Sequence, residues 1–323
     1  MALAAQDFTE EVVLKLAHHL KEITNESNLC LSGGVAYNCV ANGRIIKEDI
    51  FHQIHVPPAV GDAGSAVGAA LFTHQVLSES KQKNSKELKN EISFLGPQFS
   101  NESIAQYLRS KDQRSVQLSE QELIKAVTQS LVEGKVVGWF QGRMEFGARA
   151  LGSRSILGNP MKEDVQRQIN LKIKFRESFR PFAVILLEED LEAYFELKMA
   201  SPYMAIITDV LESRRKALPP NFEGLSIREK CDWVNSDFPG ITHVDYSSRI
   251  QTVDSKTNPL LYRLLAHFKE VTGHSLLINT SFNVNKEPIV CSPAEAYECF
   301  LKTQMDALAM GNSWIEKSIN TEL

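Results

Sequence analysis

The sequence predicts an α/β protein, and three features of the 323-residue chain indicate this class. Helical and strand-like apolar patterns alternate over residues 1–78, a polar and charged segment follows, and strand and helix patterns alternate again beyond it. The composition, 43% hydrophobic and 23% charged, is that of a globular protein with one large core or two modest ones. We therefore expect two α/β domains.

The first domain is predicted at residues 1–78. Val12, Leu16 and Leu20 recur at helical spacing, and glycines after the first predicted strand open a second helix. The expected elements are helix 8–23, strand 28–31, helix 35–46, strand 51–56 and helix 62–77.

A linker is predicted at residues 79–95, because it begins ESKQKNSKELKN and shows no apolar periodicity. The second domain, with helices and strands mixed, is then expected at 96–323, although residues 213–237 give no clear pattern. Its helices are predicted at 101–110, 119–133, 165–173, 259–271 and 293–301, and its strands at 136–140, 154–157, 182–187, 205–210, 243–253, 275–278 and 307–310.

The net charge of −5 and the pI near 6.0 disfavour a protein that binds nucleic acid or an anionic membrane. No apolar run reaches the ~18 residues that cross a bilayer, and Met1–Glu10 lacks the features of a signal peptide, so a cytoplasmic protein is expected. The five cysteines are odd in number and contain no C-x-x-C pair, which predicts neither a disulfide framework nor a zinc site.

An anion site would have to come from local basic clusters. The first is G-R-M-E-F-G-A-R-A-L-G-S-R-S-I-L at Gly142–Leu157, in which Arg143, Arg149 and Arg154 stand among glycines that let the backbone approach a ligand. Guanidinium groups fork onto phosphate oxygens, so this run suits a nucleotide or an acyl phosphate. A solvated loop of unrelated arginines is the alternative.

A second basic run, I-N-L-K-I-K-F-R-E-S-F-R-P-F at Ile169–Phe182, ends at a predicted strand. A basic helix end explains Lys172 as well as a phosphate site does. Lys174 and Arg180 are stronger candidates for binding phosphate, because the phenylalanines that follow Lys174 and precede Arg180 are expected to anchor the turn.

The third cluster, L-L-I-N-T-S-F-N at Leu276–Asn283, places Asn279, Ser281 and Asn283 at the carboxyl end of a strand, where open α/β sheets bind ligands. Local turn hydrogen bonds are the alternative. Arg249, on another predicted strand, adds a basic position that means little alone.

In the first domain, two glycine turns follow strands and open helices, which exposes backbone N–H groups to an anion. Ser32, Gly33, Gly34 and Asn38 are candidate nucleotide-binding residues, and Asp62 is a candidate metal ligand. Turns needed only for packing are the alternative, since no Walker pattern is present and one carboxylate is not a metal site.

Together these segments resemble the carbamoyltransferase family of the NodU/CmcH/TobZ type. The resemblance rests on S-G-G-V-A-Y-N, G-D-A-G-S-A-V-G-A-A, G-W-F-Q-G-R-M-E-F-G-A-R-A-L-G-S-R-S-I-L, I-K-F-R-E-S-F-R-P-F-A and L-I-N-T-S-F-N, in this order between residues 32 and 283. It implies the second lobe of an actin-like (ASKHA) transferase domain at 1–78. At 96–323 it implies a YrdC-like α/β domain with a twisted open sheet, which forms carbamoyl-adenylate from carbamoyl phosphate and ATP with Mg²⁺.

The resemblance also implies a site. It places six residues in the carbamoyl phosphate and ATP pocket: Arg149, Lys174, Arg180, Arg249, Asn279 and Ser281. Arg143 and Asn283 join them from the clusters above, and Lys174, Arg180 and Ser281 form the catalytic set that would hold carbamoyl phosphate.

The family's first transferase lobe, with an H-x-x-x-H pair that binds Fe²⁺, has no match in this sequence. We therefore expect the chain alone to hold iron weakly through Asp62, and complete transfer to an acceptor hydroxyl, whose identity the sequence does not give, is not assured. A separate first-lobe chain is a candidate partner. Ala148 also replaces the proline usual in the E-F-G-P-R-A-L-G run, which loosens the loop before Arg149. A non-catalytic remnant, or one subunit of a split enzyme, is the alternative. An RNA-binding module is disfavoured by the acidic balance.

Overall fold

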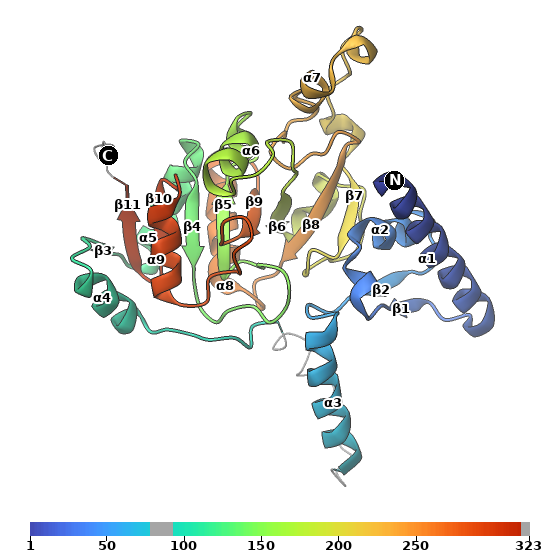
Figure 1. The fold of residues 1–323 in the computed structure, drawn as a ribbon, viewed down its shortest axis with the longest axis horizontal. Coiled ribbons are helices and arrows are strands. Elements are labelled where there is room, and N and C mark those ends of the chain that lie inside the picture. Colours follow the sequence, from blue (N-terminus) through green and yellow to red (C-terminus); the bar gives the residue numbers. More distant parts are fainter. Residues whose placement is uncertain (78–92, 318–323) are drawn as a thin grey trace.

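The computed structural model describes residues 1–77 and 93–317, and it confirms a mixed α/β architecture (Figure 1). A small amino-terminal unit with a two-stranded sheet lies beside a larger unit. Among the described residues the larger unit contains a nine-stranded mixed sheet in the order β3-β11-β10-β4-β5-β9-β6-β8-β7. The correspondence of the two units to an actin-like lobe and a YrdC-like domain stays a prediction.

The amino-terminal unit follows the predicted order of helices and strands. It comprises α1 (Ala2–Thr24), β1 (Asn28–Cys30), a 3₁₀ turn (Gly34–Tyr37), α2 (Cys39–Lys47), β2 (Gln53–His55) and α3 (Asp62–Leu77). β1 and β2 pair in parallel, and Leu29, Ile45 and Ile54 belong to a small core. The helix predicted at 35–46 is divided because Asn38 caps α2, its side chain accepting a backbone hydrogen bond of 3.1 Å.

The end of the predicted linker packs against the larger unit. Most of residues 79–95 lies outside the described part of the chain. Ser93, however, is 1% exposed, and its carbonyl accepts a hydrogen bond of 2.8 Å from the N–H of Phe146. This contact ties the start of the larger unit to the loop that joins two of its strands.

The helices of the larger unit are α4 (Asn101–Ser110), α5 (Glu120–Val132), α6 (Val165–Gln168), α7 (Ile227–Cys231), α8 (Pro259–Thr272) and α9 (Pro293–Lys302). Its strands are β3 (Val116–Gln117), β4 (Val137–Phe140), β5 (Arg154–Gly158), β6 (Ala183–Leu187), β7 (Ile206–Asp209), β8 (Ser247–Val253), β9 (Leu276–Ser281), β10 (Ala307–Met310) and β11 (Ser313–Glu316). The edge strand β3 and its neighbour β11 were not predicted. The 213–237 segment, left without assignment, contains short 3₁₀ turns and α7, which projects from the sheet (Figure 1).

Helices cover both faces of the large sheet. Successive strand residues point to opposite faces, so Trp139 belongs to the core under α5 and α8, and Phe140 to the core under α4, α6 and α9. Both side chains are at most 1% exposed. The sheet is therefore a rigid base for whatever lies at its strand ends.

Two predicted elements differ in ways that matter for function. The strand predicted at 243–253 begins only at Ser247, because the N–H of Tyr246 bonds the carbonyl of His243 at 3.0 Å and Tyr246 adopts a positive φ of 65°. The strand predicted at 275–278 continues to Ser281, which brings its polar end into the sheet.

Candidate functional site

The candidate site lies where β9 ends. Asn279 of β9 pairs with Ala183 of β6, which in turn pairs with Arg249 of β8. Residues paired across neighbouring strands, and residues two apart on one strand, lie on the same face of a sheet. Asn279, Ser281 and Arg249 are therefore presented together on one face.

Lys174 reaches this strand end from an adjoining turn. Its side chain is 3% exposed, and Nζ contacts the carbonyl of Ser281 as well as Ser281 Oγ at 3.2 Å. Nζ also lies 3.0 Å from the carbonyl and 2.7 Å from Oδ1 of Asn283. An ammonium group has three protons, so these four acceptors share them. The structure thus brings together three of the residues predicted for the site.

A π turn sets the position of Lys174. The helix predicted at 165–173 is regular only to Gln168, and Ile169–Ile173 forms a wider turn closed by the Lys174 N–H on the Ile169 carbonyl at 2.8 Å. Such single π turns are frequent at functional sites. The turn aims Lys174 at the end of β9.

The segment after Lys174 is held by Asn170 and not by the phenylalanines. Asn170 is fully buried, and its Nδ2 donates to the carbonyls of Ser178 at 3.0 Å and Arg180 at 2.8 Å. Phe175 and Phe179 are 54% and 59% exposed, so the expectation that they anchor the turn is wrong. A buried amide satisfies the turn's carbonyls, which apolar rings could not do.

Arg180 lies at the surface. Its guanidinium is half exposed, and Nε bonds Glu177 Oε2 at 2.8 Å, whereas no hydrogen bond joins it to Lys174 or Ser281 in the described part of the chain. Arg176, which the sequence did not select, is more enclosed, and its Nε donates to Asn170 Oδ1 at 2.7 Å. The signal that could have identified Arg176 was its place in the same basic run of the sequence.

Like charges crowd this region. Burial, followed by the nearby charges of Arg149 and Arg176, lowers the pKa of Arg249, whose Nε is buried without a hydrogen-bond partner in the described chain. Burial and then Arg176 lower the pKa of Lys174 to about 7. Burial and then Arg180 lower the pKa of Arg176. A bound anion would relieve both causes, because it neutralises charge that burial and repulsion disfavour.

Arg149 stands between the two units. Its guanidinium carbon lies 5.9 Å from the centre of the Tyr37 ring, which belongs to the first glycine turn of the amino-terminal unit. Arg143, from the same basic run, is exposed and donates to the carbonyl of Leu95 at 3.3 Å. Of these two predicted ligands, only Arg149 lies close enough to Arg249 to affect its pKa.

Arg154 is a structural residue. It is fully buried beneath the loop, its guanidinium carbon lies 3.7 Å from the centre of the Phe140 ring, and burial lowers its pKa to about 10. Its terminal nitrogens donate at 3.0–3.3 Å to the carbonyls of Gln141, Gly142, Ser153 and Pro97. Its two terminal nitrogens are therefore engaged by the loop and by Pro97 of the segment before α4, and its selection as part of a phosphate-binding cluster is not supported by this geometry.

Asn279 also faces the loop. It is fully buried, and its Nδ2 donates to the carbonyl of Ala150 at 3.2 Å and to Gln251 Oε1 at 2.7 Å, while Oδ1 has no partner in the described chain. Gln251 in turn donates to the carbonyl of Leu151 at 2.9 Å. Sequence reasoning did not select Gln251, although its place two residues after Arg249 puts it on the same face of β8.

The predicted nucleotide-binding turn of the amino-terminal unit has internal hydrogen bonds. Gly33 has a φ of 96° and donates to the Val60 carbonyl at 2.9 Å, and Asn38 caps α2 and exchanges side-chain hydrogen bonds with Gln6. Ser32 and Gly34 are exposed. The packing alternative accounts for Gly33 and Asn38, and a nucleotide-binding role for the turn stays a prediction.

Asp62 is exposed at the first residue of α3. Within residues 1–77 and 93–317, no three His, Cys, Asp or Glu side chains come close enough together to hold a metal ion. The same residues include no helix of the length and apolar character needed to cross a membrane.

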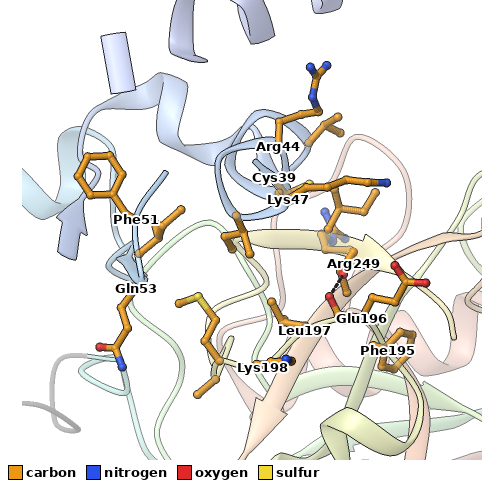
Figure 2. Close-up of a pocket in the computed structure, with 18 of the residues that line it drawn as sticks. Cys39, Arg44, Lys47, Phe51, Gln53, Phe195, Glu196, Leu197, Lys198 and Arg249 are labelled. Atoms are coloured by element: carbon orange, nitrogen blue, oxygen red, sulfur yellow. Dashed lines mark hydrogen bonds between the residues drawn. The ribbon is translucent and has the colours of Figure 1, made fainter. Parts of the chain in front are cut away.

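A cleft of about 2150 Å³ separates the two units on one side (Figure 2). α2, β2 and the segment around Phe195–Lys198 line it, and Figure 2 shows Arg249 between α2 and that segment. Beside the cleft, Asn42 Nδ2 donates to the Ala205 carbonyl at 2.9 Å and Lys47 pairs with Asp209 at 2.8 Å. Arg249 therefore connects the cluster of basic side chains around the end of β9 with the cleft.

The chain belongs to the carbamoyltransferase family. Residues 1–71 match the sequence model described as Carbamoyltransferase N-terminus, and residues 128–317 match the one described as Carbamoyltransferase C-terminus. The two matches fall on the amino-terminal and the larger unit, respectively.

Relatives in other organisms match along nearly the whole chain. The chain is 49% identical to protein sll1178 of Synechocystis sp. over 98% of its own length and 52% of the relative's. It is 36% identical to the nodulation protein NolO of Bradyrhizobium diazoefficiens, over 98% and 54%. It is 29% identical to the 3'-hydroxymethylcephem-O-carbamoyltransferase of Streptomyces clavuligerus, over 92% and 50%. The chain thus spans about half the length of the curated relatives it matches.

Among solved structures, full-length HypF in its phosphate- and nucleotide-bound form matches with a TM-score of 0.37 and 18% identity, over 58% of this chain and 20% of that one. At this TM-score the likeness does not define the fold.

Proposed function

We propose that the larger unit activates carbamoyl phosphate with MgATP to give carbamoyl-adenylate, for later transfer of the carbamoyl group to an acceptor hydroxyl. The observation that carries this proposal is the crowding of Lys174, Arg149, Arg176 and Arg249 around the end of β9, where burial and mutual repulsion depress the pKa values of three of them. Such a cluster favours a polyanion, and the resemblance of the sequence to the NodU/CmcH/TobZ type implies carbamoyl phosphate and ATP as its ligands.

The proposed reaction has two steps. Water first cleaves the bond between the carbamoyl group and phosphate, which yields carbamate and inorganic phosphate. A carbamate oxygen then attacks the α-phosphorus of ATP, a new phosphorus–oxygen bond forms, and pyrophosphate leaves with the electrons of the broken bond. The Mg²⁺ arrives with ATP as part of the substrate.

The residues have distinct tasks in this scheme. Lys174 and Ser281 bind the phosphate of carbamoyl phosphate at the end of β9, where a phosphate oxygen takes the place of one of the four acceptors around Nζ. Arg180 joins them after leaving Glu177. Arg149 and Arg249 neutralise the triphosphate, because charge-assisted contacts in an enclosed site stabilise developing charge without reorganisation. Asn283 keeps the ammonium in place, since its Oδ1 and carbonyl both accept from Nζ.

Pyrophosphate release tests the proposal. The purified chain with MgATP and carbamoyl phosphate, without any acceptor, should release pyrophosphate and form an AMP-linked product. Release at the same rate with and without carbamoyl phosphate would contradict the proposed activation. RNA retention that falls with salt would instead support a nucleic-acid role.

Iron is not given a role in this scheme. Asp62 is exposed, and the described residues bring no other two potential ligands to it, so the donor set does not fit Fe²⁺ in this chain. Metal analysis of the purified chain should find far less than one iron per chain, and Asp62→Ala should leave that content unchanged. One iron per chain that disappears in Asp62→Ala would overturn this view.

A second proposal concerns a partner, and α3 favours it. α3 buries no residue against the described part of the chain, and Leu71, Phe72, Val76 and Leu77 are 38–75% exposed. Figure 1 shows α3 extending away from the rest of the amino-terminal unit and from the larger unit. An apolar helix exposed on all sides normally packs against another surface, and the relatives are about twice as long as this chain. The occupant we propose is the family's first transferase lobe.

The partner proposal can be tested with the part of the Bradyrhizobium relative that this chain does not match, expressed alone. It should bind the chain, and Phe72→Asp should weaken binding at least tenfold by titration calorimetry. Ile227→Asp, which adds the same charge at a side chain 83% exposed on α7, is the matched control. Equal affinities for both variants, or self-association of the chain through α3 in light scattering, would overturn the proposal.

A further inference from the structure

The buried carboxyl group of Glu145 has no task in the proposed chemistry. It lies in the loop between β4 and β5 and is 7% exposed. Its Oε1 accepts three backbone hydrogen bonds, from Leu151 and Ser153 at 2.7 Å each and from Arg154 at 3.2 Å. Its Oε2 is buried and has no hydrogen-bond partner in the described chain. One oxygen thus closes the loop into a ring.

The same loop carries Arg149 at its centre and is held on its other side by the sheet. The carbonyl of Ala150 accepts from Asn279, and the carbonyl of Leu151 accepts from Gln251. The N–H of Leu151 is bound by Glu145 and its C=O by Gln251, so this peptide is fixed at both ends. This fixed peptide lies two residues after Arg149 and restrains the backbone that carries its guanidinium.

We infer that Glu145 is a positioning residue, which fixes the loop so that the Arg149 guanidinium is held between Tyr37 and Arg249. The inference rests on the proposed function, because the role of Arg149 in binding ATP belongs to it. Gln251 and Asn279 complete the arrangement from the sheet. Through this loop the buried carboxyl group controls the affinity for ATP without touching it.

The acceptor oxygen of Glu145 holds the loop, while the carboxylate charge acts mainly on the buried Arg154, whose cationic form it favours. Burial raises the pKa of the Glu145 carboxyl, while the three N–H groups favour the ionised form. Oε1 accepts these hydrogen bonds in either state. A glutamine places an amide oxygen at the same position, so Glu145→Gln keeps the ring, whereas Glu145→Ala leaves three buried N–H groups without an acceptor.

Kinetics separate this role from a general structural one. Glu145→Ala should raise KM for MgATP at least tenfold, with KM for carbamoyl phosphate and kcat within threefold of wild type, and Glu145→Gln should restore KM to within threefold. In an Arg149→Ala background, Glu145→Ala should change KM for MgATP less than twofold, because it acts through Arg149. Glu163→Ala, at an exposed carboxylate of the same unit, is the control. Fully additive effects, or equal losses in the Ala and Gln variants, would overturn the inference.

Hydrogen exchange provides a readout that needs no activity. Peptides covering residues 146–154 should exchange at least tenfold faster in Glu145→Ala than in wild type and at the wild-type rate in Glu145→Gln, while β6 peptides stay protected in both. Unchanged exchange in Glu145→Ala would overturn the inference. If wild type releases no pyrophosphate, the proposed function fails, and exchange together with calorimetric MgATP affinity still decides the role of Glu145.

Discussion

The ammonium nitrogen of Lys174 lies 2.7 Å from Oδ1 of Asn283, and the same oxygen accepts a hydrogen bond of 2.7 Å from Ser281 Oγ. One amide therefore orients both groups that the proposed reaction places against carbamoyl phosphate. Because Asn283 is outside the regular part of β9, the arrangement depends on the turn that follows the strand.

Lys174→Ala and Arg180→Ala should each reduce carbamoyl-phosphate-dependent turnover by roughly 10- to 100-fold, because each would lose a charge-assisted contact to the phosphate worth ~1.5–3 kcal/mol, which Arg180 makes only after it leaves Glu177. Steady-state pyrophosphate release measures the effect. Lys172→Ala, at an exposed lysine, is the control and should stay within ~0.5 kcal/mol of wild type. If Lys174→Ala and Lys172→Ala prove equally harmless while both stay folded, Lys174 does not bind carbamoyl phosphate and the assignment of this pocket fails.

The stability of the protein should depend on the protonation of Lys174. Its pKa falls from 10.5 to about 7 on folding, so between these values the unfolded chain binds more protons and the free energy of unfolding rises with pH. Lys174→Met should therefore lose roughly 2 kcal/mol of the increase that wild type shows between pH 7.5 and 9.5. Urea unfolding at both pH values measures it, with Lys172→Met as control. Parallel pH profiles for wild type and Lys174→Met would show that the ammonium keeps its ordinary pKa.

Asn283→Asp changes the charge beside Lys174 with almost no change in shape. The new carboxylate should raise the pKa of Lys174 and repel the phosphate dianion, so KM for carbamoyl phosphate should rise roughly tenfold or more. Asn285→Asp places the same charge at an exposed position two residues further on and should have little effect. An unchanged KM in Asn283→Asp would place carbamoyl phosphate elsewhere.

Arg154→Met should destabilise the fold by at least ~3 kcal/mol, because it leaves several buried carbonyls without a donor at ~1–3 kcal/mol each. Chemical denaturation measures the loss. Arg143→Met, in the same loop but exposed, should change stability by less than ~0.5 kcal/mol. If Arg154→Met keeps full stability but binds ATP more weakly, Arg154 is a ligand-binding residue and not a structural one.

Apolar periodicity predicts the fold well where one segment packs against one neighbour. The helices at Asn101–Ser110 and Pro259–Thr272 fall within a residue or two of their predicted ends, because capping residues and apolar spacing agree there. The strands β3 and β11 escaped prediction because strands of only two and four residues are too short to show a clear alternating pattern. The same holds for the π turn, whose extra residue is invisible in the apolar pattern.

Residue type predicted which groups could bind an anion but not which were free to do so. Lys174, Ser281 and Asn283 were selected as polar groups near a strand end, and they meet in the structure. Arg154 has the same side chain as Arg149, yet its terminal nitrogens are used by loop carbonyls that only the folded backbone brings together. The role of each arginine depends on its burial and on its hydrogen-bond partners, and a run of basic residues in the sequence shows neither.

The direction in which the Lys174 side chain points depends on the number of residues in the turn at Ile169–Ile173. Each residue of a helix advances the side-chain direction by about 100°, so one residue more or less in this turn would swing the ammonium away from β9 even with every side chain kept. A substitution of Lys174 changes the chemistry of the side chain and leaves its position in the chain unchanged. Deletion of the exposed residue Leu171 would instead turn the whole side chain away from β9. The spacing from Val165 to Lys174 is thus as much a part of the site as the lysine itself.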